Sequence, residues 1–414
     1  MRTSFVPVVI VVHALVGCSS GGASPSPGPS ELLEPPPIGA GIQYRMVSTL
    51  APGQEIERCQ LFVAPPAGLN VRADEVRFTS GSHHVLLFRT PYQEIPAQTL
   101  QGVPIDATRA HDCPDGPGAD WDVNGMIAGS QSMNGDTILG TLPDGVALRV
   151  EPGTVLLMNT HYLNASAEPV ETDARINLHT LPDEEVKVEA GVLFHYNFFI
   201  HVPAGGAASA RMRCPVEHDI EIVRLQSHMH RRGVGFAANL VPGGGGAMTE
   251  IYATTRWEQV PAGNFSPPLR VKAGDALDSR CDYQNHEAGD VVQGSTTKDE
   301  MCVLIGPYYP RSPGLGNCLD ERGFPAQTWI GSGAATCAET LGCFAQADHF
   351  QDRFPCVVNS CAGAAAEVSD VVRCQMTQGH GACADTCGGG GDCAACVGAA
   401  CAAEVMACQA AACD

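Results

Sequence analysis

The sequence predicts a mainly β protein, with two tandem antiparallel β-sandwiches of jelly-roll type followed by a small, helical, disulfide-stapled domain. Short apolar alternations broken by Gly, Pro, Asn and Asp run from about residue 43 to residue 292, a pattern typical of sandwiches. The 46 glycines and 30 prolines also favour turn-rich β structure. Beyond Trp329 the chain becomes rich in Ala, Gly and Cys, and Cys pairs about one helical turn apart indicate short, cross-linked helices.

The N-terminus predicts export. Arg2 precedes an apolar run that is too short to anchor the chain in a bilayer, so residues 1–17 are interpreted as a signal peptide. The run ends in Leu-Val-Gly before Cys18, which resembles a bacterial lipobox whose cysteine becomes lipidated; an ordinary cleavage site with a chance cysteine is the alternative. Ser19 after that cysteine resembles the pattern sent to the outer membrane. We therefore predict a lipoprotein of the outer membrane or cell surface, held by its lipid and a Ser/Gly/Pro tether over residues 18–45.

Charge and cysteine content narrow the class of protein. The 24 Lys and Arg against 45 Asp and Glu give a net charge of -21, which argues against nucleic acid as a partner. Without Cys18, the other 18 of the 19 cysteines form an even set, as an exported disulfide-bonded protein requires. The pair Cys393 and Cys396 has zinc-ligand spacing, but no second pair with histidine accompanies it, so disulfides are favoured over zinc.

A charged run at residues 183–185 separates two strand-rich blocks of similar size. We place the first domain at residues 46–185, the second at 186–325 and the Cys-rich domain at 334–414.

Histidines mark the candidate sites. His83 and His84 open an apolar strand, where a surface pair is the commoner outcome because neighbouring strand residues point to opposite faces. His161 ends a strongly apolar strand, and such a histidine is more often a core residue. His228 and His230 alternate in a strand pattern, which puts both imidazoles on one face as a chelating pair requires.

Met301 lies between Glu300 and Cys302, and taken alone it is a core methionine. Together, however, these motifs resemble the copper type II, ascorbate-dependent monooxygenases, the family of dopamine β-hydroxylase and peptidylglycine α-hydroxylating monooxygenase. The resemblance extends over residues 54–318 in the family's order. It implies two copper ions, the first bound by three histidines and the second, catalytic one by two histidines and a methionine. The first set is His83, His84 and His161, and the second is His228, His230 and Met301.

The cysteines agree with this resemblance. The family's disulfide pattern implies the pairs Cys59 with Cys113, Cys281 with Cys302, and Cys214 with Cys318. The run from Gly135 to Gly140 is a further echo of the family.

The resemblance implies hydroxylation of a C–H bond in a small organic substrate by O2, with ascorbate or a similar one-electron donor. Imidazole suits both copper oxidation states, whereas a thioether favours Cu(I), so the two ligand sets are suited to different steps. The family's peptide-hydroxylating enzyme anchors the carboxylate of its substrate with Arg and Tyr, at positions where this chain has Gln226 and Ile305. We therefore do not expect peptidyl-glycine to be the substrate. Two alternatives stay open: a cell-surface copper-binding or copper-delivery lipoprotein without turnover, and a structural surface module.

Overall fold

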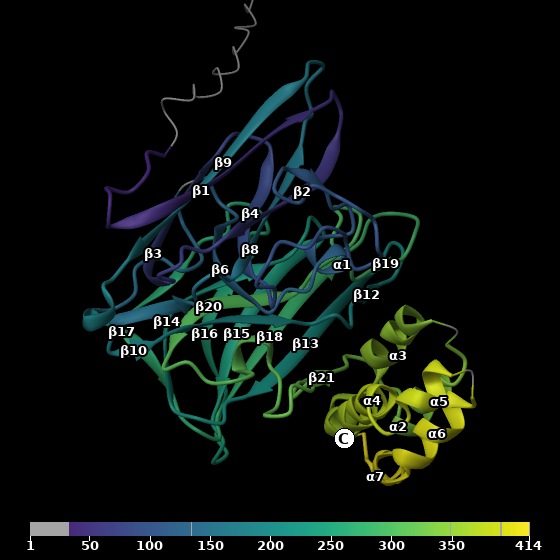
Figure 1. Ribbon diagram of the computed structural model, residues 1–414. Coiled ribbons are helices and arrows are strands. Elements are labelled where there is room, and N and C mark those ends of the chain that lie inside the picture. Colours follow the sequence, from purple (N-terminus) through teal and green to yellow (C-terminus); the bar gives the residue numbers. More distant parts are fainter. Residues whose placement is uncertain (1–32, 134, 348, 390, 414) are drawn as a thin grey trace, which may run out of the picture.

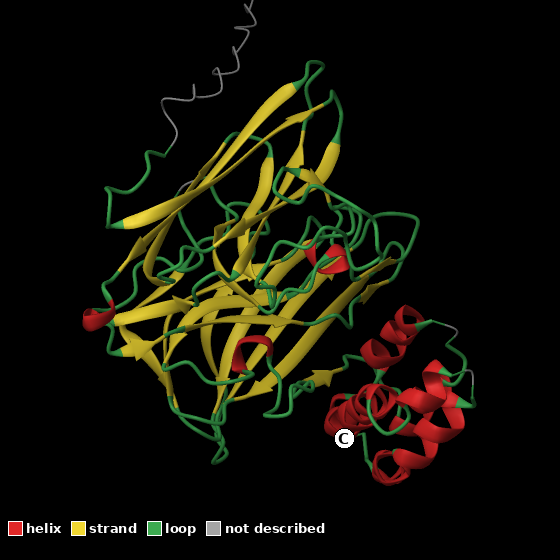
Figure 2. Ribbon diagram, in the orientation of Figure 1, coloured by secondary structure: helices red, strands yellow, loops and turns green. Residues whose placement is uncertain are grey.

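The structure is a computed structural model that describes residues 33–413 except 134, 348 and 390. The predicted signal peptide, Cys18 and most of the predicted tether lie outside the described residues. The described chain is mainly β, and its long helices gather at the C-terminal end (Figure 2), which confirms this part of the predicted fold class. The sandwich arrangement and the count of two domains stay predictions.

Two five-stranded sheets are built entirely from residues 41–189. Their strands are antiparallel except for the parallel β7–β10 pair. The first sheet has the order β1 (Gly41–Leu50), β9 (Val170–Thr180), β3 (Leu69–Phe78), β7 (Val146–Val150), β10 (Val188–Glu189). The second has the order β5 (His111–Asp112), β2 (Glu55–Val63), β8 (Val155–Leu163), β4 (Ser82–Arg89), β6 (Gly125–Ser130). We call residues 41–189 the first half of the β region; β1 begins inside the segment predicted as tether.

The second half of the β region comprises residues 191–330 and shares no strand pairing with the first half among the described residues. One sheet has the order β11 (Gly191–Tyr196), β20 (Val303–Tyr309), β14 (Ile220–His228), β17 (Gly263–Val271). Another has the order β16 (Thr249–Thr254), β15 (Gly233–Val241), β18 (Ala276–Gln284), β13 (Ala207–Pro215), β21 (Thr328–Ile330), and a short pair joins β12 (His201–Val202) to β19 (Val291–Val292). In the described part of the β region, the short helices are α1 (Pro117–Asp120), η2 (Asp183–Glu185) and η3 (Leu315–Asn317).

The hydrophobic cores explain why the halves stay together. In the first half, residues of both five-stranded sheets, such as Val76 of β3 and Leu157 of β8, are buried in one hydrophobic cluster. The same cluster also contains Val303 and Ile305 of β20, so the two halves share apolar contact. Burial of this kind contributes about 25 cal/mol per Å² of apolar surface. The two sets of predicted ligands are therefore held close to each other.

The C-terminal region is helical and lies beside β12, β13 and β21 (Figure 1). Its elements are α2 (Cys337–Phe344), η4 (Phe350–Arg353), α3 (Phe354–Asn359), η5 (Ala362–Ala364), α4 (Ala365–His380), α5 (Ala384–Gly388), α6 (Cys393–Ala400) and α7 (Ala402–Ala410). Thr336 begins α2 with a capping box to Glu339, which satisfies backbone N–H groups that the first turn leaves unpaired. No single described helix is long and apolar enough to cross a membrane; α6 and α7 would reach that length only together, and they meet at 64°.

All 18 cysteines in the described residues form disulfides. Those in the helical region are Cys337–Cys408, Cys343–Cys356, Cys361–Cys413, Cys374–Cys401, Cys383–Cys396 and Cys387–Cys393. Because Cys393 and Cys396 are bonded to other cysteines, neither thiol is left to bind zinc. The β region has the three pairs that the family resemblance implies, Cys59–Cys113, Cys214–Cys318 and Cys281–Cys302.

Candidate metal centre

A β-bulge brings the adjacent histidines of the first half together. Strand β4 pairs with β8 so that Ser82 faces Tyr162 and His84 faces His161, which leaves His83 as the extra residue. A bulge interrupts the alternation of a strand and re-aims a side chain, and bulges are common beside active sites. The rings of His83 and His84 therefore lie 5.5 Å apart, and their centroids are 5.8 and 5.6 Å from that of His161.

In the second half, His228 is the last residue of β14, and His230 lies in the turn that follows rather than in the strand itself. The turn closes with a hydrogen bond from the backbone N–H of Gly233 to the carbonyl of His230. The two rings are 5.3 Å apart. The proximity that the sequence suggested for these two imidazoles is present, but it results from a strand end and a turn.

Glu300 connects this turn to Met301. The fully buried Glu300 carboxylate accepts hydrogen bonds from the backbone N–H groups of His230 and Arg232, at 3.0 and 2.8 Å. Burial raises the pKa of Glu300 to about 7. The next residue, Met301, accepts a hydrogen bond on its carbonyl from the Tyr283 hydroxyl at 2.7 Å. The backbone of Met301 is thus fixed relative to the histidine turn.

The imidazoles of both halves meet in one cluster, which we call the histidine cluster: His83, His84, His161, His228 and His230. The ring of His83 lies 5.1 Å from that of His228 and 5.5 Å from that of His230, although they belong to different halves. Ligand nitrogens of His83, His84 and His228 all lie within 4.8 Å of one another. Within the described residues, this potential metal-binding group therefore combines histidines that the sequence assigned to two separate sites.

Four of these histidines use one ring nitrogen in a hydrogen bond, which orients the ring. His84 Nε2 is 2.8 Å from Asn159 Oδ1, and His161 Nε2 is 3.0 Å from Glu55 Oε1. His228 Nδ1 is 2.8 Å from Gln131 Oε1, a residue of the first half, and His230 Nδ1 is 3.0 Å from the carbonyl of Asp299. Metal-ligating histidines characteristically donate their other N–H to such an acceptor, because it fixes the tautomer and the ring orientation.

The remaining nitrogens show whether the residues fit a metal. His83 Nε2, His84 Nδ1, His161 Nδ1 and His230 Nε2 are buried without a hydrogen-bond partner. Buried polar groups are normally paired, and unpaired ones often mark a site for an ion. An all-imidazole donor set with a nearby thioether suits copper. The residues present thus fit the family's metal.

Burial and mutual repulsion keep these imidazoles neutral. Burial is the main cause, and it lowers the pKa of His84 to about 3 and that of His230 to about 4. The pKa of His83 and of His228 is lowered well below the ordinary value by burial and by the neighbouring histidines. Only a neutral imidazole offers a lone pair to a metal, so the cluster is ready to bind one at neutral pH.

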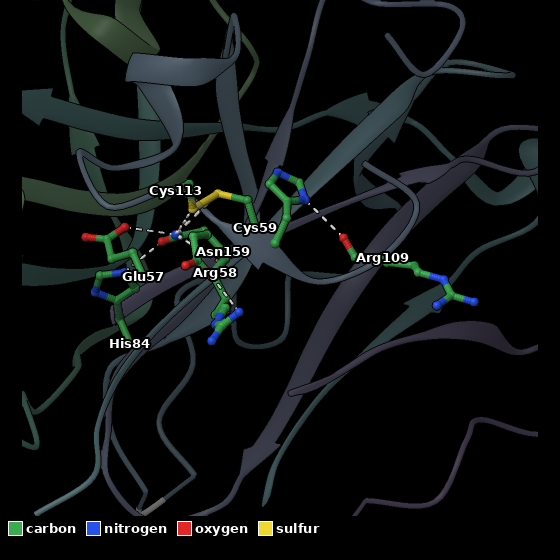
Figure 3. The surroundings of a disulfide bond; sticks show 9 residues. Glu57, Arg58, Cys59, His84, Arg109, Cys113 and Asn159 are labelled. Atoms are coloured by element: carbon green, nitrogen blue, oxygen red, sulfur yellow. Dashed lines mark hydrogen bonds and ion pairs between the residues drawn. A yellow bond between two sulfur atoms is a disulfide. The ribbon is translucent and has the colours of Figure 1, made fainter. Parts of the chain in front are cut away.

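A chain of buried, hydrogen-bonded polar groups orients the His84 ring (Figure 3). Asn159 Nδ2 donates to Glu57 Oε2 at 2.9 Å, so its carbonyl oxygen faces His84. The same amide nitrogen lies 3.8 and 3.7 Å from the sulfurs of the Cys59–Cys113 disulfide. Burial raises the pKa of Glu57 to about 7. The disulfide joins β2, the strand that carries Glu57, to the segment of Cys113. It therefore fixes the groups that contact the Asn159 amide.

A cavity of about 610 Å³ opens beside the cluster, lined by His84, His228 and Met301. Its apolar wall consists of Leu86, Phe88, Val123, Ile138, Phe194, Val292 and Ile305. Apart from the histidines, the charged side chains among its described lining residues are Glu57, Asp115 and Asp299, and no Lys or Arg is among them. A pocket of this size and composition accepts a small organic molecule.

Sequence reasoning missed the residues that orient the histidines. Asn159 had a signal, because it lies two residues before His161 and two-residue spacing places both on one face of β8. For Gln131 and Trp257 the sequence carried no such signal. Trp257, whose ring is 5.9 Å from that of His83, belongs to the connection between β16 and β17 and reaches the cluster only in the folded chain.

Comparison with known proteins identifies the second half. Residues 203–322 match the family model described as copper type II ascorbate-dependent monooxygenase, C-terminal domain. The matched segment contains His228, His230 and Met301.

Among solved structures, that of infectious bursal disease virus, Gx strain, covers 71% of this chain and 77% of its own chain at 11% identity, with a TM-score of 0.17. Particles derived from the same virus, of a mutant VP2 protein, match at 12% identity over 70% and 73% of the two chains, also with a TM-score of 0.17. Scores this low carry no argument about fold.

Proposed function

The chain belongs to the copper type II ascorbate-dependent monooxygenases, and from this premise we propose that it hydroxylates a C–H bond of a small organic substrate with O2. In the proposed reaction the substrate gains one oxygen atom, and two electrons from ascorbate or a similar donor, with two protons, reduce the other to water. The observation that carries the proposal is the histidine cluster with its unpaired nitrogens; its members His84 and His228, together with Met301, line a cavity.

Two coppers are proposed, one on His83, His84 and His161 and one on His228, His230 and Met301. When bound there, copper would supply the activation of O2 and the one-electron steps. The protein's own contribution is to hold neutral imidazoles in fixed orientations through Asn159, Glu55, Gln131 and the Asp299 carbonyl.

The cavity explains how a substrate would be held. Its apolar wall excludes water and packs against a hydrocarbon body. The carboxylates of the lining and the lack of any basic side chain there favour a neutral or cationic substrate over an anion. Glu57, with a pKa of about 7, is able to hold or release a proton near neutral pH on the cavity wall. The positions that bind a peptide carboxylate in the family's peptide enzyme hold Gln226 and Ile305, in keeping with this preference.

The cysteines indicate where the protein is located. The disulfide-rich chain is typical of an exported or extracellular protein. We propose further that Cys18 carries a lipid that anchors the protein at the outer membrane or cell surface.

The proposal is tested with copper-loaded protein, ascorbate, 18O-labelled O2 and a panel of phenethylamine-like and small apolar compounds. The expected result is one labelled oxygen atom in a hydroxylated product. His228→Ala abolishes it, whereas His218→Ala, at an exposed histidine outside the cluster, leaves it unchanged. Oxygen uptake with no labelled product from any compound would contradict the proposal and favour a copper-binding protein without turnover.

A further inference from the structure

Among the described residues, the copper-site cavity has one wall residue that does not come from the β region. This residue is Gln351 of η4, in the Cys-rich helical region, and it lies at the rim with an exposed side chain. The sequence suggested that this region is separate from the ligand-bearing part of the chain. The helices instead lie directly against the second half, next to β12 and β21 (Figure 1).

Aromatic packing fixes η4 against the β region. The ring of Phe350 lies 5.9 Å from that of Phe198 and 6.0 Å from that of Phe199. Phe354 adds a contact with Phe199 at 5.6 Å, and Trp329 of β21 packs on Phe199 at 4.9 Å. Such pairs each contribute about 0.5–1.5 kcal/mol beyond the area they bury. Gln351 follows Phe350 directly, so these contacts set its position.

Polar and covalent links hold the rest of the helical region in the same place. Ser369 of α4 accepts a hydrogen bond from the backbone N–H of Trp329 at 2.8 Å, and Arg373 donates to the carbonyl of Gln327 at 3.0 Å. The Cys343–Cys356 disulfide closes the segment that contains η4. The Asp352 carboxylate accepts from the backbone N–H of His349 at 2.8 Å, which caps the short helix.

The helical region also supports the cavity wall from behind. Val292 of β19 lines the cavity and packs against the cluster that contains Phe199, Trp329 and Phe354. Its neighbour Gln293 donates a hydrogen bond to the hydroxyl of Tyr196, another lining residue. One side of the cavity therefore depends on the helical region for its shape, and its rim is completed by a side chain of that region.

We propose that the Cys-rich helical region is the specificity element of the cavity, with Gln351 as the residue that meets the end of the substrate remote from the metal ligands. This inference rests on the proposed function for the identity of the substrate, but not for the existence of the binding site. The Gln351 amide both donates and accepts hydrogen bonds, so it suits a hydroxyl or amine on an otherwise apolar molecule. Its side-chain size limits how long that molecule is.

The experiment measures binding to the full-length protein by 19F relaxation of two probes, 4-fluorophenethylamine and 4-fluorobenzyl alcohol, in the metal-free and Cu(II)-loaded forms. Gln351→Trp, which narrows the rim, is expected to weaken binding at least tenfold in both forms. Gln346→Trp is the matched control, because Gln346 is exposed in the same region and lines neither the cavity nor its rim. It is expected to bind as the wild type does.

Wild-type affinity in Gln351→Trp would overturn the inference, as would the failure of both probes to bind the wild type. Paramagnetic Cu(II) is expected to add relaxation to the bound probe, because the ligands line the same cavity. If Gln351→Trp weakens binding but Cu(II) adds no relaxation, the specificity element stands and the proposed copper function fails. The two ideas are thus separated by one set of samples.

Discussion

Replacing Gln131 with alanine removes a side chain of the first half that holds a proposed ligand of the second half. Its Oε1 accepts from His228 Nδ1 at 2.8 Å, and its Nε2 donates to the carbonyl of Ser227 at 2.6 Å. All three residues are buried, with Gln131 only 5% exposed. Water therefore has little access with which to replace the lost hydrogen bonds.

The cost follows from these contacts. A buried group left without its partner costs about 1–3 kcal/mol, and the substitution strands one donor, His228 Nδ1–H, and one carbonyl, that of Ser227. We expect the metal-free protein to lose about 2–6 kcal/mol of unfolding free energy, because two groups are stranded. Removing the partner that orients a metal-binding histidine lowers metal affinity about 10–100-fold. We therefore expect copper at the His228, His230 and Met301 site to bind 10–100-fold more weakly, with the three-histidine site unchanged.

The assay titrates copper into wild type, Gln131→Ala and a control, Gln60→Ala, and follows each site by electron paramagnetic resonance; denaturant unfolding gives the stability separately. Gln60 is a fitting control because its amide donates to the carbonyl of Thr108 on an exposed face of β2. Equal copper affinity at the second site in Gln131→Ala and wild type would refute the idea that this glutamine orients His228. Equal weakening at both sites would show a general loss of structure instead.

Three further outcomes are expected. His161→Ala should lose one of two coppers by metal analysis, and the loss of both or of neither would contradict the two-site assignment. Met301→Leu conserves volume and should lower the unfolding free energy by under about 1.5 kcal/mol. Hydroxylation should be lost, and X-ray absorption of the reduced protein should no longer show a copper–sulfur shell. Cys302 cannot supply that sulfur because it is bonded to Cys281. Burial raises the pKa of Glu57 from 4.5 to about 7, so the folded state keeps a proton that the unfolded chain has lost, and stability should fall by up to about 3 kcal/mol as pH rises from 4.5 to 7. Glu57→Gln should flatten that profile in denaturant titrations, and an unchanged slope would show that another group is responsible.

The sequence was informative wherever local pattern decides the structure. Alternating apolar residues predicted the β content, and the change to Ala, Gly and Cys predicted a helical, disulfide-bonded end, because both depend on neighbours in the chain. The pattern was less informative about His83 and His230. The bulge at His83 is set by the pairing of β4 with β8, and His230 is held by a turn and by Glu300 rather than by a continuing strand. Register and strand ends of this kind depend on partners far along the chain.

The contact between the two halves is the feature that a single sequence predicts least. One motif that resembles the family, the run from Gly135 to Gly140, nevertheless has a physical explanation in this contact. The segment that ends at Gly140 runs against β14, where Arg224 Nη1 donates to the carbonyl of Thr137 at 2.9 Å. Gly140 has φ +64°, and a Cβ there would collide with the Arg224 guanidinium. Any larger residue would therefore be strained, and its Cβ would displace the Arg224 side chain. His228 ends β14 and Gln131 begins the approaching segment, so the room that Gly140 leaves for Arg224 lets the two segments that carry this hydrogen-bonded pair contact each other.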